Sequence, residues 1–411
     1  MADHLFIQFY SRSREGIYSL NNGFSDTWDL CRARGELLWV EHRVPHARRD
    51  DPDAYAEQEL PVRQGTVLVS ALTTGHLYQA YVWARRHPGL RVVVGGPVAS
   101  EKSTGTGRWD PLYVKVDDPG ALPPNLVITG RSVEDWLGVP DFSGTWRVEL
   151  PDGIPPEAPV YVSYTLDNGC YWGRCVYCNI GLHAKERFRR RRRLAYEFAG
   201  MDHPGPKIIR LNTGSITPGT IRRVIPGLPR EGFEYRTFMR SARAENDALE
   251  GVIEQTGGRL PDLVLGLGLE FPSDRMLRRM GKGFGTSEML RTLRICRDAG
   301  IRVNANLILG WKDLTGADLE DLERFFDRLP EGAFTTAQVR WLLAHPHTPI
   351  HEAYLGDPIR LGPFYEGFRV RIGPEQLARN RRAAEILLRY SRKKGFELQG
   401  WKGLQEHLEA A

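Results

Sequence analysis

The chain has few cysteines and no long apolar run. Only five of its 411 residues are cysteine, and three of these lie within nine positions. This usage excludes a disulfide framework, which needs paired cysteines spread through a small secreted chain. No apolar run approaches the roughly 18 residues of a membrane span, and the start Met1-Ala-Asp-His has no charged-then-apolar leader. We therefore expect a cytoplasmic protein without a membrane partner.

Charge of one sign is not in large excess either. The chain has 56 basic and 51 acidic residues, a net charge of +5, which does not by itself indicate nucleic acid. With 41% hydrophobic and 26% charged residues, the composition is that of a folded domain. One local feature stands out, the arginines at Arg187 and at 189–193. They form either a solvated helix start or a contact for phosphate or carboxylate groups of a substrate or a reductase.

The first 150 residues alternate between predicted strands and helices. Residues 77–86 have helical spacing between two strands, and turn glycines punctuate the segment. Strands alternating with helices predict a Rossmann-like parallel sheet with both faces covered. The Pro-rich stretch 150–159 then marks a domain boundary. The predicted strands are short apolar or β-branched runs at 5–10, 37–44, 66–71, 91–94 and 126–129.

After residue 159 the alternation resumes, which predicts a partial (β/α)6 barrel over 159–350. A C-terminal extension, 351–411, contains an amphipathic helix at 374–394. We expect an α/β protein with a 1–150 sheet domain, this barrel and a short helical extension. The barrel strands are predicted at 161–165, 207–212, 234–240, 263–269, 303–309 and 337–343, with helices at 273–280, 287–299 and 318–327.

A cysteine loop follows the first predicted barrel strand. Its ligand candidates are Cys170, Cys175 and Cys178, in the spacing Cys-x4-Cys-x2-Cys. Three thiolates can hold three irons of a [4Fe–4S] cluster and leave the fourth iron open to a ligand from solution. Glycines let the backbone wrap a bulky inorganic core. They are Gly169, Gly173 and Gly181.

Zinc is the alternative for this loop. The three cysteines and His183 would make a Cys3His set, and spacing alone does not decide between zinc and a cluster. The setting favours the cluster, because structural zinc holds together small units that lack a core. Cys31 and Cys296 stand alone and are predicted to be ordinary thiols.

In this setting residues 159–350 resemble the radical S-adenosylmethionine (SAM) superfamily. The usual loop of that family is Cys-x3-Cys-x2-Cys with an aromatic residue before the last cysteine, a place that Tyr177 fills. The first gap here is one residue longer. Residues 267–283, Leu-Gly-Leu-Glu-Phe-Pro-Ser-Asp-Arg-Met-Leu-Arg-Arg-Met-Gly-Lys-Gly, are similar to the segment after the family's fourth strand. Residues 304–310, Asn-Ala-Asn-Leu-Ile-Leu-Gly, are similar to its fifth-strand signature.

The resemblance implies that SAM binds the open iron and is cleaved by one electron to a 5′-deoxyadenosyl radical. It also implies an electron donor such as flavodoxin or ferredoxin. Glu270 and Asn306 are then candidates for contacts to the ribose and the amino-acid part of SAM. Arg240 or Arg243, at the end of the third strand, is the candidate for the SAM carboxylate.

The second strand departs from the family. Where the family often carries Gly-Gly-Glu to hold the methionine amino group, residues 211–215 read Leu-Asn-Thr-Gly-Ser without an acidic residue. Either Asn212 or Thr213 substitutes through neutral hydrogen bonds, or SAM binds in a different pose.

The N-terminal domain resembles cobalamin-binding Rossmann-like domains. Ser70-Ala-Leu72 at a strand end and Gly95-Gly96 after the next strand are similar to the Ser-x-Leu and Gly-Gly elements that admit the cobalamin tail. The family's Asp-x-His-x-x-Gly element, which supplies a cobalt ligand, is absent. Cobalamin therefore binds without a histidine ligand, or the domain has kept only the fold. His76 is predicted to be a polar loop residue and not a cobalt ligand.

The leading hypothesis is a radical SAM enzyme that modifies a small molecule or a peptide, with cobalamin-dependent C-methylation as one form. Modification of tRNA or protein is an alternative that the arginine run supports; against it, cysteines for a second cluster and an evident RNA-binding domain are lacking. A cobalamin-free rearrangement or epimerisation is also open. The non-enzymatic alternative, which is not favoured, is a zinc-stabilised protein that binds nucleic acid.

Overall fold

The computed structural model describes most of the chain in two compact units. One unit comprises Met1–Ser163, Ala195–Ile208 and Pro358–Gly367, and the other Tyr164–Leu194, Ile209–Asp357 and Phe368–Ala411. The residues that the structure describes are 4–13, 15–21, 23–24, 27–44, 51–60, 65–96, 122–129, 133–139, 146–166, 169–180, 198, 201–354 and 356–410.

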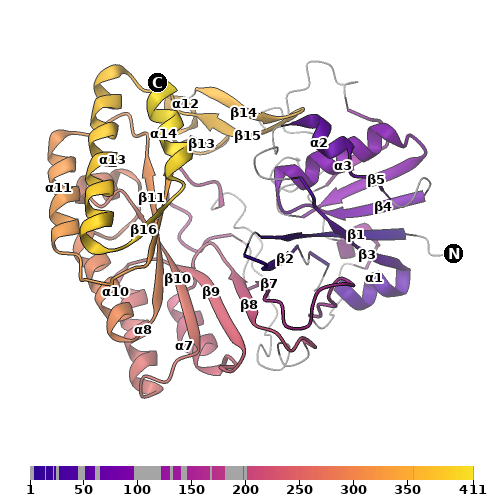
Figure 1. The fold of residues 1–411 in the computed structure, drawn as a ribbon, viewed down its shortest axis with the longest axis horizontal. Helices are drawn as coiled ribbons and strands as arrows, with labels where there is room; N and C mark the ends of the chain where they lie inside the picture. The colour runs from indigo at the N-terminus through magenta and orange to yellow at the C-terminus, as the bar shows by residue number, and fades with distance from the viewer. Residues whose placement is uncertain are drawn as a thin grey trace. The chain divides into compact units, whose positions relative to one another are not determined.

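The first unit is built on a parallel sheet (Figure 1). Its strands lie in the order β3-β1-β4-β5-β6, all parallel, and β2 runs antiparallel to the end of β1. The elements are β1 (His4–Arg12), β2 (Tyr18–Leu20), α1 (Trp28–Arg34), β3 (Gly35–Glu41), α2 (Pro52–Ala56), β4 (Gly65–Ser70), α3 (Thr74–Arg86), β5 (Leu90–Gly95), β6 (Leu126–Ile128) and α5 (Val133–Trp136).

The predicted strands of this unit are confirmed, with one shifted. The strand predicted at 37–44 runs from Gly35 to Glu41, so it starts directly after α1. A glycine permits this start, because a Cβ at Gly35 would overlap the carbonyl of His4 on β1. The helix predicted at 77–86 begins earlier, at Thr74, because the Thr73 hydroxyl accepts a hydrogen bond from the His76 amide and caps it.

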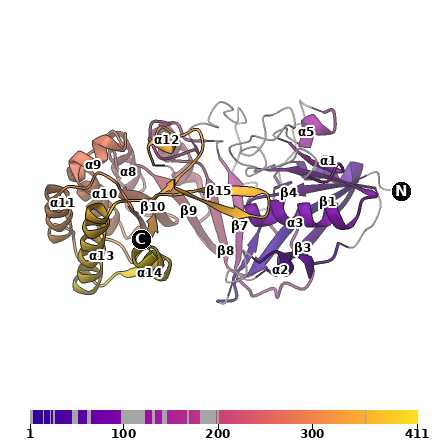
Figure 2. The same ribbon diagram turned by 90° about the horizontal axis from the view of Figure 1, so that it is seen from above.

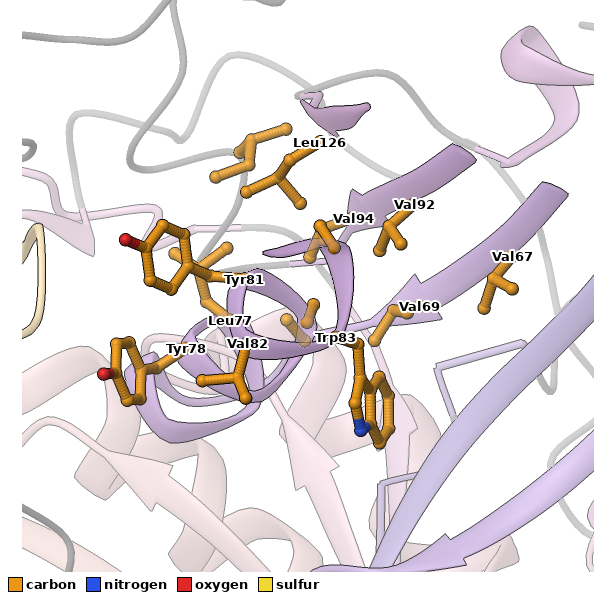
Figure 3. Close-up of a cluster of buried hydrophobic side chains, with 14 of the residues drawn as sticks. Val67, Val69, Leu77, Tyr78, Tyr81, Val82, Trp83, Val92, Val94 and Leu126 are labelled. Carbon is orange, nitrogen blue, oxygen red and sulfur yellow. The ribbon is translucent and has the colours of Figure 1, made fainter. Parts of the chain in front are cut away.

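Both faces of this sheet are covered, as the sequence predicts. Alternate residues of β1, β4 and β5 point to opposite faces. On one face, Val67, Val69, Val92 and Val94 lie against α3, whose Trp83 is fully buried (Figure 3). On the other face a second cluster packs around α1, with these buried members: Phe6, Phe24, Trp28, Cys31, Leu37, Leu68 and Val93.

The second unit also holds a parallel sheet. Strands β9, β10, β11 and β12 pair in parallel in chain order, β7 and β8 precede them, and β16 pairs with β12. Its elements, with those at its boundaries, are β7 (Val160–Thr165), β8 (Lys207–Asn212), α7 (Pro218–Val224), the 3-10 turn η4 (Ile225–Gly227), β9 (Phe233–Met239), α8 (Arg243–Gln255), β10 (Asp262–Glu270), α9 (Asp274–Arg279), α10 (Thr286–Asp298), β11 (Arg302–Leu309), α11 (Gly316–Asp327), β12 (Thr336–Trp341), β13 (Leu343–Ala344), α12 (His351–Tyr354), β14 (Asp357–Leu361), β15 (Phe364–Arg369), α13 (Pro374–Lys394), β16 (Glu397–Gln399) and α14 (Trp401–Ala410).

Helices α8, α10, α11 and α13 follow one another along one side of this sheet (Figure 2). Helix α13 has the predicted bounds, because Pro374 opens it and Gly395, in the left-handed conformation at φ 73°, ends it. The extension also supplies strands β14, β15 and β16 beside the predicted helix. None of the helices in the described ranges has the length and apolar content of a membrane span.

Helices α9 and α11 are joined at their N-termini by one carboxylate. Asp318 closes a capping box with Thr315 at the start of α11. The same carboxylate accepts a hydrogen bond of 2.6 Å from Ser273, which caps α9, and one of 3.0 Å from Arg275. Burial would raise the pKa of Asp318, but the hydrogen bonds from Arg275, Ser273 and Thr315 outweigh it and lower the pKa to about 2. This network fixes the segment after β10.

Candidate functional site

The cysteine loop follows β7 at the edge where the parallel strands end. Cys170, Cys175 and Cys178 are half-buried free thiols. Burial raises the pKa of Cys175, and it raises the pKa of Cys178 to about 11. Burial therefore disfavours the thiolate forms that bind iron or zinc, and a nearby cation favours them. The separate Cys31 and Cys296 are buried.

Two segments approach this loop so closely that only glycine fits. A Cβ on Gly214, after β8, would lie 2.6 Å from the Cβ of Cys170, and its amide donates to the Gly169 carbonyl at 2.7 Å. Gly281 and Gly283 have φ of 73° and 71°, and a Cβ on either would overlap the loop. The backbone is therefore fitted around the cysteines.

The turn at 280–283 holds the loop through main-chain carbonyls. The Val176 amide donates to the Met280 carbonyl at 3.1 Å, and the Trp172 indole N–H donates to the Gly281 carbonyl at 2.7 Å. On the far side of the loop, the Ile350 amide donates to the Val176 carbonyl at 3.2 Å. The loop is thus held in place by hydrogen bonds to two other segments of the chain, in addition to its own internal contacts.

A buried ion pair lies behind the loop. The Lys282 ammonium is 3.0 Å from a Glu270 carboxylate oxygen, and both side chains are only 9% exposed. Lys282 also donates to the Tyr177 hydroxyl at 3.4 Å. Burial would lower the pKa of Lys282, but the Glu270 carboxylate outweighs it and the pKa is raised. Burial also raises the pKa of Tyr177 well above its ordinary value, so its hydroxyl stays protonated.

The backbone of β10 is irregular at Glu270, the acidic member of this ion pair. Glu270 has φ of 54°, a left-handed conformation that is unusual for a non-glycine residue, and the pairing with β11 shifts register between Gly268 and Glu270. Gly268 leaves space for the pair, because a Cβ there would lie 2.8 Å from the Lys282 ammonium. Such strain is found at functional sites.

Arg240, after β9, lies against the loop. Its guanidinium donates to the Lys282 carbonyl at 2.7 Å and to the Tyr171 hydroxyl at 3.1 Å, and it stacks 3.8 Å from the centre of the Trp172 ring. Arg243 differs. Its side chain is 83% exposed at the start of α8, where it faces Asp247 at 3.9 Å. The structure brings Arg240 and not Arg243 to the cysteine loop.

The remaining predicted SAM contacts lie on neighbouring strands. The Asn212 carbonyl, at the end of β8, accepts a hydrogen bond from the Leu166 amide at 2.9 Å. Thr213 donates to the Ser215 carbonyl at 3.1 Å. Asn306 pairs in register with Gly268 on β10, beside the buried ion pair. All three are half-buried, and their predicted roles stay predictions.

The donor set fits a cluster with separate iron ligands. In a [4Fe–4S] cube each cysteine binds a different iron, so the thiolates need not converge on one ion. Within the described ranges, no three His, Cys, Asp or Glu side chains are grouped to hold a single metal ion. His183 of the zinc alternative, Gly181 and the arginine run at 187 and 189–193 lie outside the described residues.

In the first unit, the predicted cobalamin residues meet at the ends of β4 and β5. The Ala71 amide donates to the Gly95 carbonyl at 2.9 Å. Gly96 has φ of 96°, and a Cβ there would lie 2.7 Å from the Ala71 carbonyl oxygen. The Ser70 carbonyl accepts a hydrogen bond from the Asn21 side chain at 2.8 Å. Ligands of open α/β sheets bind at this edge of the strands.

Leu72 lies on the loop after β4, whereas His76, predicted as a loop residue, lies in the first turn of α3, because the Thr73 cap starts that helix at Thr74. Leu72 is one of the few large apolar side chains exposed in the described residues, at 43%. His76 accepts a hydrogen bond from the Leu72 amide through Nδ1 at 3.3 Å and stacks on Phe9. Burial lowers the pKa of His76 to about 3. The imidazole is therefore neutral, and it ties the start of α3 to the preceding loop through the Leu72 amide.

Comparison with known proteins yields structural relatives only. No family model and no curated protein matches the chain. The cobalamin- and [4Fe–4S]-bound radical SAM methyltransferase TsrM from Kitasatospora setae superposes with a TM-score of 0.54 at 16% identity, over 85% of this chain and 77% of TsrM. OxsB, a cobalamin-dependent SAM radical enzyme with aqua-cobalamin and SAM bound, gives 0.51 at 12% identity, over 96% of this chain and 62% of OxsB. The chain has a radical SAM fold. The predicted fold class, a Rossmann-like domain with a radical SAM barrel, is confirmed.

Within this radical SAM fold, the sequence did not indicate the role of Lys282. The motif Met280-Gly-Lys-Gly283 was matched as a segment, yet the structure shows that its lysine pairs with Glu270 and its carbonyl holds Arg240. Trp172 was also missed as the residue between Arg240 and the turn. A lysine between two glycines, twelve residues after a strand-end glutamate, is a sequence signal that could have found the pair.

Proposed function

We propose that this chain is a radical SAM enzyme that transfers a methyl group to a small-molecule substrate with the help of cobalamin. The observation that carries the proposal is a loop of three free cysteines, held by glycine-mediated backbone contacts, in a radical SAM fold. Cys170, Cys175 and Cys178 hold the [4Fe–4S] cluster. When bound, this cluster supplies the electron for the reductive cleavage of SAM.

The SAM-binding residues are proposed from their place beside the loop. Arg240 is the proposed carboxylate contact, because it lies on the loop's aromatic residues while Arg243 is exposed. Glu270, held by Lys282, which also donates to Tyr177, is the proposed contact to the SAM ribose. The half-buried side chains of Asn212, Thr213 and Asn306 are proposed as neutral hydrogen-bonding partners. Each acts by orienting SAM and excluding water from the open iron.

The proposed cobalamin site is the edge formed by Ser70, Leu72, Gly95 and Gly96. When bound, cobalamin supplies a carrier for the methyl group. The support is the small-residue contact between the ends of β4 and β5 and the likeness in fold to TsrM and OxsB, whose structures contain cobalamin. No histidine ligand to cobalt is proposed, because His76 is committed to the Leu72 amide.

A small-molecule substrate is proposed because TsrM, similar in fold, is described with a tryptophan substrate and a SAM analogue. That structure matches with a TM-score of 0.51 at 15% identity. The reduced cluster also needs an electron donor of the flavodoxin or ferredoxin type. An oxygen-sensitive cluster with free thiol ligands fits the cytoplasm, which is the proposed location.

The test is anaerobic reconstitution with iron, sulfide and cobalamin, followed by metal analysis and by incubation with SAM. We expect about four irons per chain, retained cobalt, and both S-adenosylhomocysteine and 5′-deoxyadenosine as products of SAM. The matched variants are Cys175→Ala, which loses iron, and Gly96→Val, which loses cobalt and keeps iron. A cobalt-free protein that still cleaves SAM productively would remove the cobalamin part, and a colourless protein with one zinc would remove the whole proposal.

A further inference from the structure

A pocket of about 560 Å³ opens beside the cysteine loop in the second unit. The cysteine loop contributes Trp172 and Arg174 to the wall of this pocket, and α9 contributes Asp274 and Arg278. Phe284, directly after the 280–283 turn, also lines it. The pocket therefore reaches from the surface of α9 to the residues between Cys170 and Cys175.

The charges around this pocket favour an anionic partner. Arg174 and Arg278 are exposed, and neither forms an ion pair in the described part of the chain. The pocket also has one acidic side chain, Asp274, against these two basic ones. Its carboxylate accepts a hydrogen bond from the Thr286 amide at 2.7 Å, at the start of α10. Arg279, next to Arg278, is already paired with Asp313. Two unpaired guanidinium groups thus face solvent at the mouth.

The aromatic wall connects the pocket to the cluster ligands. Trp172 lies two residues after Cys170, and the guanidinium carbons of Arg240 and Arg174 lie 3.8 Å and 4.9 Å from the centre of its ring. Its indole N–H is fixed by the Gly281 carbonyl. A molecule seated on Arg174 and Arg278 would contact the outer side of the loop through this rigid ring.

We propose that this surface docks the acidic electron-transfer protein that reduces the cluster. The inference rests on the proposed function, which requires such a donor. The donor loses one electron, and the cluster passes from the 2+ to the 1+ state without a change in bound atoms. Arg278 supplies long-range attraction and orientation, as charges at the rim of an interface do, and Trp172 forms the contact nearest to the cysteine ligands.

The test compares two reductants on the reconstituted holoprotein. Reduced flavodoxin must dock, whereas dithionite is a small molecule that need not. We expect Arg278→Glu to slow flavodoxin-dependent bleaching of the cluster absorbance by about fivefold or more at low salt, and to weaken binding of oxidised flavodoxin in calorimetry. Arg278→Gln should show a smaller effect in the same direction. The rate with dithionite and the iron content should stay at wild-type values in both variants.

The matched control is Arg259→Glu, the same charge reversal at an exposed residue just before β10, at the opposite strand end from the loop. It should behave as wild type with both reductants. The proposal is overturned if Arg278→Glu is reduced by flavodoxin at the wild-type rate and salt dependence, if Arg259→Glu is slowed equally, or if dithionite reduces the wild-type cluster and flavodoxin does not. Failure of the proposed function is distinguishable, because the wild-type protein would then bind no iron and dithionite would have nothing to reduce.

Discussion

Replacing Lys282 by methionine removes one half of the buried ion pair behind the cysteine loop. Both side chains are 9% exposed, and within the described chain the Lys282 ammonium has two polar side-chain contacts, Glu270 at 3.0 Å and Tyr177 at 3.4 Å. Methionine keeps most of the apolar stem and removes the charge. Loss of one partner leaves an uncompensated buried carboxylate, which costs about 3–5 kcal/mol of unfolding free energy.

The assay is urea unfolding of the iron-free protein, followed by tryptophan fluorescence. Lys393→Met is the matched control, because Lys393 pairs with Asp327 at the same 3.0 Å but both side chains are more than half exposed. An exposed pair is worth about 0–1 kcal/mol, so the control should change stability little. In Glu270→Gln/Lys282→Met the buried charge is gone, and the double variant should be more stable than Lys282→Met. Equal stability of Lys282→Met and Lys393→Met would refute the reasoning.

Three further predictions concern the loop, the SAM site and acid stability. Gly214→Ala should lower the iron content after reconstitution, because its Cβ would lie 2.6 Å from the Cβ of Cys170, whereas Gly227→Ala, with open space at its Cβ, should not; equal iron in both would contradict the close approach. Arg240→Gln should weaken SAM binding in calorimetry at least tenfold (about 1.4 kcal/mol), while the exposed Arg243→Gln should not, and the reverse order would contradict the assignment. Asp318→Asn should cost about 1–3 kcal/mol at pH 6. The folded pKa of Asp318, about 2, lies below its unfolded value, so its contribution is present above that unfolded value and is lost as the pH falls towards 2; urea titrations of the iron-free protein in which wild type and Asp318→Asn differ equally at pH 6 and pH 2 would contradict this.

Local sequence patterns predicted the bounds of two elements correctly. Strand β8 and helix α13 have the predicted bounds, the helix because a proline and a glycine mark its ends. The short strand β16 was missed, because it has only three residues and exists through pairing with β12, some sixty residues earlier in the chain. Such non-local pairing leaves no periodicity in the segment itself.

The candidate site likewise has features that local sequence patterns predict and features that only the fold shows. The cysteine spacing and Tyr177 are local and could be found in the sequence. The choice between Arg240 and Arg243 could not be made there, because both follow β9 and only the fold shows that one stacks on Trp172 while the other faces solvent. The Lys282–Glu270 pair likewise depends on a bulge in β10 and on the left-handed backbone of Glu270.

The measurement that tests the account most directly is the electron paramagnetic resonance spectrum of the reduced, reconstituted protein with and without SAM, together with its iron content. We expect about four irons per chain, a reduced-cluster signal that changes when SAM is added, and loss of both in Cys175→Ala. A protein in which Cys175→Ala keeps its iron, or whose signal is the same with and without SAM, would contradict a cluster held by three cysteines with one open iron.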